Sequence, residues 1–361
     1  MSLSMIRNGL LVGALVFAIT ACGGGSGSGT GQSPATSGMT SGSTGAVGSG
    51  SGSGASSGSG TSGGSSSSGT PSGSGTSGTG SGSAPGGTSG TTTPAVPAKS
   101  AKRGIAYDLA DPADFQALSP GVSWWYNWSP RPNAGAPTAY LTQYQMDFYP
   151  MIWGVNYDVN AVEAFLLANT RIKYLLVLNE PNLTSQSNLT PQQAAGIWPD
   201  FEAISAKTGV KIVGPAITWG TMANYNDPIQ WLDAFYAAYE AANNNRQPQI
   251  DYLAFHWYDY GLASQLDRLA KYGKPFWVTE FANWHSQNDG AQIDTLAKQE
   301  AQMKDMVATC ESRSDVFRYA WFTGRMSNDV HYTSLLGAPG QLTGLGQLYL
   351  TLPYTTAYAG P

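Results

Sequence analysis

The chain has 361 residues, a formal net charge of −5 and only 11% charged residues. An acidic balance argues against a nucleic-acid partner, because binding the phosphate backbone calls for a basic patch. A neutral ligand suits this composition better. The averages are diluted by a long Gly- and Ser-rich stretch, so they do not describe the part of the chain that can fold.

The N-terminus has the features of an export signal. Arg7 begins a short polar start, residues 10–19 are apolar, and Ile19-Thr20-Ala21-Cys22 follows. The apolar run is shorter than the roughly 20 residues that a membrane-spanning helix needs, so we predict a signal peptide over residues 1–21. The final tetrapeptide resembles the lipobox of bacterial lipoproteins, which implies that Cys22 becomes the lipid-bearing first residue of an exported, envelope-anchored protein. By the same resemblance, Gly23 after Cys22 favours the outer membrane or cell surface.

Residues 22–98 are expected to form a disordered tether. From Gly23 to Ala98 the chain contains neither a charged nor an aromatic residue. Such a segment cannot bury enough apolar surface to offset the entropy of ordering it. If Cys22 carries lipid, Cys310 has no disulfide partner, and we expect Cys310 to be a small core residue.

Residues 99–361 contain eight short runs that are apolar almost throughout, a pattern typical of parallel strands buried on both faces. Segments with helical spacing separate several of them, and no Gly-rich dinucleotide motif follows any strand. This favours a single (β/α)8 barrel over an open doubly wound sheet. The predicted strands are 103–108, 122–128, 148–154, 174–181, 211–218, 251–260, 275–282 and 317–324, and the predicted helices are 161–168, 191–208, 228–243 and 294–311.

Two carboxylates lie at the ends of predicted strands. Glu180 ends the fourth strand and Glu280 ends the seventh. In such a barrel the carboxyl ends of the strands carry the catalytic residues, so both side chains should meet in one mouth. A protonated and an ionised carboxyl group together suit glycosidic bond cleavage. Asp108 and Asp259 also follow strands but lack an opposite partner, so we expect them to have structural or binding roles.

The motifs SWWYNW, MIWG, LNEPN, GPAIT, FHWY, GKPFWVTEFANW and YAWF occur in this order over residues 103–324. This set resembles glycoside hydrolase family 128, in clan A, whose known members act on β-1,3-glucans. The resemblance implies a retaining double displacement with Glu180 as acid/base and Glu280 as nucleophile, and Asn179 holding the sugar 2-hydroxyl. The charge of Glu280 would keep Glu180 protonated until the sugar is attached. His256 and Tyr258 are expected to hydrogen-bond Glu280 and hold it ionised.

Aromatic side chains crowd the same strand ends. Neutral sugars present flat C–H faces, which aromatic rings can cover. We expect Trp128, Trp153 and Trp284 to line the groove, since each lies at or just beyond a strand end. Trp321 resembles the strand-eight Trp that forms the floor of the cleaved sugar's subsite in clan A.

No metal or cofactor is expected, because the three His residues show no ligand spacing and no phosphate loop or nucleophile elbow occurs. The expected partners are a neutral β-glucan and, through the lipid, a membrane, and the protein is expected to act as a monomer. Two alternatives remain open. One is a clan A hydrolase acting on a differently linked glucan or on mannan. The other is a non-catalytic wall-binding or sugar-sensing protein on the same barrel.

Overall fold

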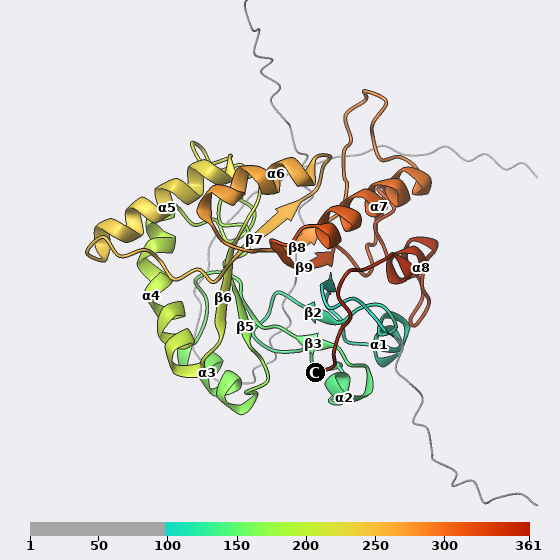
Figure 1. The fold of residues 1–361 in the computed structure, drawn as a ribbon, viewed down its shortest axis with the longest axis horizontal. Coiled ribbons are helices and arrows are strands. Elements are labelled where there is room, and N and C mark those ends of the chain that lie inside the picture. The colour runs from blue at the N-terminus through green and yellow to red at the C-terminus, as the bar shows by residue number, and fades with distance from the viewer. Residues whose placement is uncertain (1–97) are drawn as a thin grey trace, which may run out of the picture. The chain divides into compact units, whose positions relative to one another are not determined.

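The strands of the computed structural model, which describes residues 98–361, pair in parallel in the order β3-β2-β1-β9-β8-β7-β6-β5-β4. The first and last strands of this order are separated only by Tyr149 and Pro150, so they are two halves of one barrel strand and the sheet closes on itself. Pro150 has no backbone N–H to donate, which accounts for the break. The predicted (β/α)8 barrel is confirmed, with helices around the strands (Figure 1). The strands are β1 (Arg103–Ala106), β2 (Trp124–Tyr126), β3 (Asp147–Phe148), β4 (Met151–Ile152), β5 (Tyr174–Val177), β6 (Lys211–Ile217), β7 (Tyr252–Trp257), β8 (Phe276–Phe281) and β9 (Val316–Trp321).

The helices predicted from spacing are also confirmed to within a few residues. The longest, α4, begins with a capping box between Thr190 and Gln193 and ends at Gly209, which adopts φ +77°. The predicted signal peptide, tether and Cys22 lie outside the described residues. The helices are α1 (Pro112–Leu118), α2 (Tyr140–Gln143), α3 (Val159–Ala168), α4 (Pro191–Thr208), α5 (Pro228–Ala242), α6 (Leu262–Leu269), α7 (Leu296–Ser312) and α8 (Gly344–Thr351), with a 3₁₀ turn at Ala270–Tyr272.

Alternation along the strands divides the apolar residues into two cores. The larger core lies between the sheet and the helices, and the smaller one fills the barrel. Trp124 is the largest inward residue of β2, and a Cβ on Gly104 would lie 2.2 Å from its indole. Gly104 therefore leaves the room that this indole occupies. The inward set is Ala106, Trp124, Tyr126, Tyr149, Met151, Leu176, Val213, Ala216, Ala254, Trp277 and Ala320.

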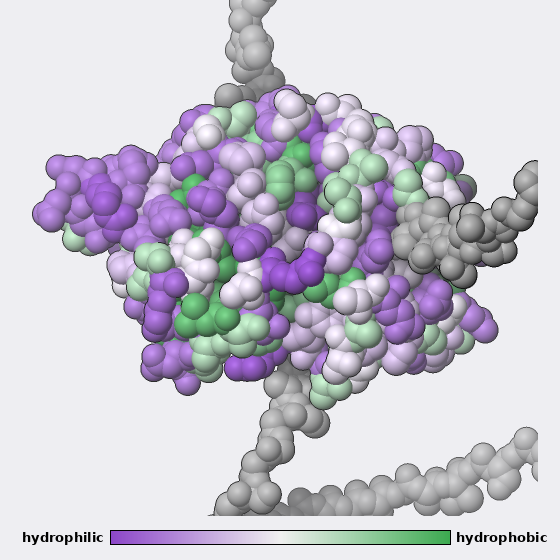
Figure 2. Space-filling model, turned by 60° about the horizontal axis from the view of Figure 1, so that its bottom comes forward, coloured by the Kyte–Doolittle hydropathy of each residue, from purple (hydrophilic) through white to green (hydrophobic). Residues whose placement is uncertain are grey.

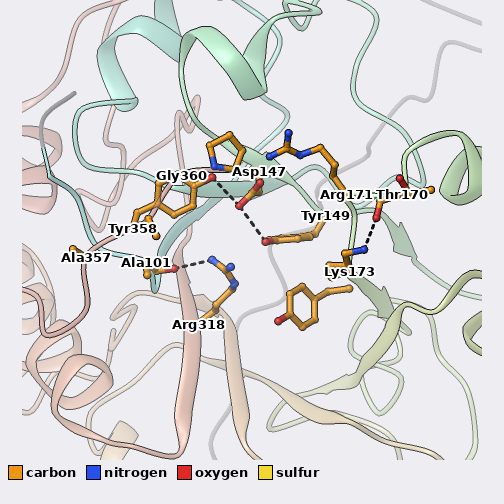
Figure 3. Close-up of a pocket in the computed structure, with 13 residues that line it drawn as sticks. Ala101, Asp147, Tyr149, Thr170, Arg171, Lys173, Arg318, Ala357, Tyr358 and Gly360 are labelled. Carbon is orange, nitrogen blue, oxygen red and sulfur yellow. Dashed lines mark hydrogen bonds between the residues drawn. The ribbon is translucent and has the colours of Figure 1, made fainter. Parts of the chain in front are cut away.

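The chain enters the barrel at the edge where the strands begin. Ser100 pairs with Ala357 in an antiparallel bridge, and the buried ammonium of Lys99 donates to three backbone carbonyls. Beside this entry lies a hollow of about 610 Å³, whose lining residues include Asp147 and Arg318 (Figure 3). The Arg318 guanidinium lies 5.4 Å from the Trp277 ring, so it closes this end of the barrel. Polar side chains cover much of the face shown in Figure 2, with apolar ones in small groups.

Two further features bear on the predictions. Within residues 98–361, the structure has no helix both long and apolar enough to cross a bilayer. Cys310 is a free thiol in α7, fully buried in the outer core, as predicted.

Candidate active site

The backbone around Glu180 is fixed by its two neighbouring strands. The chain leaves β5 at Val177, and the N–H groups of Asn179 and Glu180 donate to Trp153 O and Ala216 O, both at 2.8 Å. Glu180 has φ +43°, in the left-handed region that a residue with a Cβ seldom adopts. This unusual conformation is held where the carboxylate must be aimed, a common property of functional sites.

Glu280 lies in β8, where its carboxylate accepts hydrogen bonds on both oxygens. Oε1 accepts from the Tyr126 hydroxyl at 2.8 Å and from the Trp128 indole N–H at 2.7 Å. Oε2 accepts from the Tyr258 hydroxyl. Three protein donors thus converge on one carboxylate and fix its orientation.

His256 lies between the two glutamates. Its Nδ1 is 2.9 Å from Glu180 Oε1 and 3.3 Å from Glu280 Oε2, and the side chain is fully buried. One atom from each of these three side chains lies within 4.8 Å of the other two. Glu180 and Glu280, far apart in the chain, therefore meet in one mouth, as the sequence predicts.

Burial and neighbouring charges raise the pKa values of Glu180, Tyr126 and Tyr258. Burial raises the pKa of Glu180 above its ordinary value; the hydrogen bond from His256 opposes this and the charge of Glu280 adds to it. A carboxyl group with a raised pKa keeps its proton for donation. Burial, followed by the charge of Glu280, also raises the pKa values of Tyr126 and Tyr258 well above normal, so both hydroxyls remain donors.

The same three side chains could offer ligand atoms to a metal ion. However, both oxygens of Glu280 already accept hydrogen bonds, and His256 Nδ1 faces both glutamates. These contacts describe an acid–base network, in which the oxygens serve as acceptors for protein donors.

Aromatic rings form a wall beside Glu280, made of Trp128, Tyr258, Trp284 and Phe322. Tyr258 and Trp284 are stacked, with centroids 4.3 Å apart. Phe322 contacts the other three rings at 5.5–5.8 Å. All four side chains are partly exposed, which leaves apolar faces available to a ligand.

On the other side of the mouth lie Asn179 and Trp153. Asn179 Nδ2 donates to Gln186 Oε1 at 3.2 Å, whereas its Oδ1 has no partner among the described residues. Trp153 is 36% exposed and follows Met151 by two residues, so it continues the inward alternation of β4. Both positions are compatible with sugar contacts.

Two predicted assignments need correction. Trp321 is fully buried in the outer core, where its indole N–H donates to Thr333 O and its ring lies 6.0 Å from Tyr349 of α8. It faces the helices, so it cannot form the floor of a sugar site. Its neighbour Phe322 takes the inward position instead. The second correction concerns His256, which was predicted both to contact Glu280 and to bind substrate. Its Nδ1 does lie 3.3 Å from Glu280 Oε2, but the side chain is fully buried and lies closer still to Glu180, so it holds the carboxylates rather than the substrate.

Tyr126 was missed as a site residue. The signal was present in the sequence, because Tyr126 follows inward-facing Trp124 by two positions. The two other acids at strand ends, Asp259 and Asp108, do not contact Glu180 or Glu280. Asp259 contacts His285 at 2.9 Å. Asp108 lies exposed beyond β1, and partial desolvation raises its pKa.

The barrel and its paired carboxylates define the class of a glycoside hydrolase. Residues 104–349 match the family model of the glycosyl hydrolase catalytic core. The chain is 64% identical to an endo-β-1,3-glucanase of glycoside hydrolase family 128, subgroup II, from Pseudomonas viridiflava, with a TM-score of 0.71 over 71% of this chain and 100% of that one. This protein therefore belongs to glycoside hydrolase family 128.

Two more distant similarities agree with this assignment. A subgroup II endo-β-1,3-glucanase of the family from Sorangium cellulosum is 34% identical over 71% of this chain and all of that one, with a TM-score of 0.60. Alkali-sensitive linkage protein 1 of Schizosaccharomyces pombe is 26% identical over 265 residues, 70% of this chain. The present chain spans 45% of that relative's length.

Proposed function

We propose that this protein hydrolyses β-1,3-glucan by double displacement with retention of configuration. Glu180 is the acid/base and Glu280 the nucleophile. The observation that carries the proposal is the approach of the two carboxylates, with one ligand atom from each within 4.8 Å. Retaining glycosidases hold their carboxyl groups about 5–5.5 Å apart, whereas inverting ones leave roughly 6.5–9.5 Å for a water molecule.

In the first half-reaction Glu280 attacks the anomeric carbon while Glu180 gives its proton to the leaving oxygen. The C–O bond to the leaving sugar breaks and an ester to Glu280 forms. The loss of charge on Glu280 removes the repulsion that favoured protonated Glu180. Glu180 can then take a proton from water, which attacks the ester and releases the sugar and the Glu280 carboxylate.

The substrate class rests on the relatives. The similar enzymes from Pseudomonas viridiflava and Sorangium cellulosum are both named endo-β-1,3-glucanases, and a family 128 enzyme from Amycolatopsis mediterranei has been solved with laminaritriose. We extend this substrate to the present chain, with internal bonds as the sites of cleavage. The aromatic wall and Trp153 would supply apolar faces for a neutral chain of glucose units.

The test is release of reducing ends from laminarin. The wild type should cleave it to a mixture of oligosaccharides, whereas Glu180→Gln and Glu280→Gln should lose at least about a thousandfold in kcat while still binding laminarihexaose. Glu240→Gln is a matched control, since Glu240 lies near the end of α5, on the outer helix layer. Binding by the wild type without cleavage of any β-glucan would favour the sugar-binding alternative.

We further propose that Cys22 is lipidated and that the protein is exported and anchored to the cell envelope, at the outer membrane or cell surface. The support is the order of small residues and Cys after the apolar run of residues 10–19. Labelling with a palmitate analogue should mark the wild type and fail to mark Cys22→Ser.

A further inference from the structure

His285 lies in the segment that joins β8 to α7, and both of its ring nitrogens face a carboxylate. Nδ1 is 2.9 Å from Asp259 Oδ1, and Nε2 is 3.1 Å from Asp289 Oδ2. The side chain is only 11% exposed. Asp259 belongs to the segment after β7 and Asp289 to the same loop as His285, so the ring joins two rim segments.

This geometry specifies the protonation state of the ring. A neutral imidazole has a single N–H, so it can donate to only one of the two aspartates. In that state the other carboxylate would face a nitrogen lone pair. Both contacts are hydrogen bonds only when the ring is an imidazolium. The direction of the pKa shift of His285 agrees with a protonated ring. Burial lowers this pKa, but Asp289 and Asp259 outweigh burial and raise it overall.

The loop from residue 285 to 293 depends on this clamp and on a few polar contacts. Ile293 N donates to His285 O at 2.8 Å, and the Tyr260 hydroxyl donates to Ala291 O at 2.6 Å. Lys298 of α7 donates to Gln292 O at 2.9 Å and pairs with Asp294. The charged and titratable groups that face the ring are Asp259, Asp289 and Tyr260. Farther out, Lys298 contacts the loop, and so does His331, whose Nδ1 lies 2.9 Å from Ile293 O and whose ring stacks on Trp284.

The clamp adjoins the aromatic wall. Trp284 directly precedes His285. Its backbone N–H donates to Tyr258 O at 2.8 Å, and its ring stacks on the Tyr258 ring with centroids 4.3 Å apart. The Tyr258 hydroxyl in turn donates to Glu280. A loop that moved at His285 would therefore move the ring that covers Tyr258.

We propose that His285 is a positioning residue: as an imidazolium between Asp259 and Asp289 it fixes the loop 285–293 and holds Trp284 against Tyr258, the donor to Glu280. The nucleophile side of the cleft is then fully assembled in acidic solution and loosens as the pH rises. The sign follows from linkage. The pKa of His285 is higher in the folded protein than in the unfolded chain, where it is about 6.5. The stability that its proton contributes is therefore complete below pH 6.5 and is lost as the pH rises through the pKa of the folded protein.

The loop itself can be followed without substrate. Backbone hydrogen exchange of residues 286–293 should be measured in the full chain for wild type and His285→Gln, compared at equal pH in steps from 5.5 to 9.5. We expect exchange in the variant to be about tenfold faster at pH 5.5, because the variant lacks the two charge-assisted hydrogen bonds of the imidazolium. The ratio should fall to one at high pH, where the wild type has also lost its proton. The proposal is overturned if the ratio of the two exchange rates is close to 1 at pH 5.5, or if this ratio does not change with pH.

Two further variants sharpen the test. Asp289→Asn removes the half-exposed carboxylate that faces Nε2 of His285. Its exchange rate relative to the wild type should show the same dependence on pH, which keeps the test available if His285→Gln folds poorly. Asp294→Asn is the matched control, because Asp294 pairs with Lys298 rather than with His285. Its exchange rate relative to the wild type should not depend on pH.

The link to Trp284 rests on the proposed function and has its own readout. For laminarihexaose, KM of the wild type divided by KM of His285→Gln should be below one at pH 5.5 and should approach one in base. Equal KM values throughout, together with a positive exchange result, would overturn the link to Trp284 and leave the clamp. A wild type without hydrolytic activity would contradict the proposed function instead, and the exchange measurement would still decide the clamp.

Discussion

Nδ1 of His256 lies 2.9 Å from Oε1 of Glu180, closer than any other side-chain donor to this carboxylate in the described part of the chain. The same atom faces Glu280 at 3.3 Å. One buried ring is thus shared by the two groups to which the proposed mechanism gives opposite protonation states. Its loss should alter the pH dependence of the reaction and not only its rate.

The first prediction concerns the alkaline limb of kcat/KM. Burial raises the pKa of Glu180 and His256 opposes this rise, so removing the donor should raise it further and move the alkaline limb to higher pH. His256→Leu should show this shift. His256→Asn keeps an amide N–H near the position of Nδ1 and should restore most of the wild-type profile. A limb that stays in place in His256→Leu would mean that Glu180 does not set it.

The barrel and the meeting of Glu180 and Glu280 were predictable because both depend on short-range patterns. Apolar runs at regular intervals identified all eight barrel strands, and a carboxylate directly after the fourth strand, like one at the end of the seventh, must face the mouth. Leu178 and Glu180 adopt φ of +58° and +43°, which the sequence did not suggest, because neither residue type favours that region.

The side-chain assignments were less predictable, because they depend on which way each strand faces. Ala320 lies in the inner core and Trp321 in the outer one, so the inward residue after Ala320 is Phe322. Counting alternation from Ala320 would have found this. However, the register of β8 against β9 shifts between Val278 and Phe281, and no local sequence pattern predicts this irregularity.

The second prediction contrasts the two neighbours on β9. Trp321→Phe leaves Thr333 O without its donor and opens a small cavity, so the free energy of unfolding should fall by roughly 2–4 kcal/mol with KM unchanged. Phe322→Ala should lower kcat/KM by about tenfold, since it removes a partly exposed ring of the wall. Denaturant titration and steady-state kinetics measure the two effects. An unaltered stability and raised KM in Trp321→Phe would restore the original assignment.

The third prediction concerns the donors to Glu280. Trp128→Phe keeps a ring but removes the N–H that lies 2.7 Å from Oε1. A hydrogen bond to a charged group contributes about 1.5–3 kcal/mol, so kcat should fall roughly 10- to 100-fold. Trp219→Phe is a suitable control, because the Trp219 ring packs against the Arg268 guanidinium at 5.4 Å and does not donate to Glu280. Equal activity of Trp128→Phe and wild type would show that this donor does not support the nucleophile.

The fourth prediction concerns the open side of the mouth. Trp153 has an exposed ring beside the loop that carries Glu180, and Trp153→Ala should therefore weaken the binding of long oligosaccharides by about tenfold. Its stability should change little, because the ring is not part of either core. Calorimetric titration of Glu180→Gln with laminarihexaose, with and without Trp153→Ala, measures the effect without turnover. Identical affinities would place the sugar chain elsewhere.

The double displacement itself can be tested through the configuration of the newly formed sugar end. Proton NMR of laminarihexaose, recorded in the first minutes after adding enzyme and before mutarotation, distinguishes the two anomers. Glu280 attacks from the face opposite the leaving oxygen, and water then attacks from the face that the leaving oxygen vacated. Two such inversions predict that the β-anomer appears first and the α-anomer only later. Initial release of the α-anomer would contradict the roles assigned to Glu180 and Glu280.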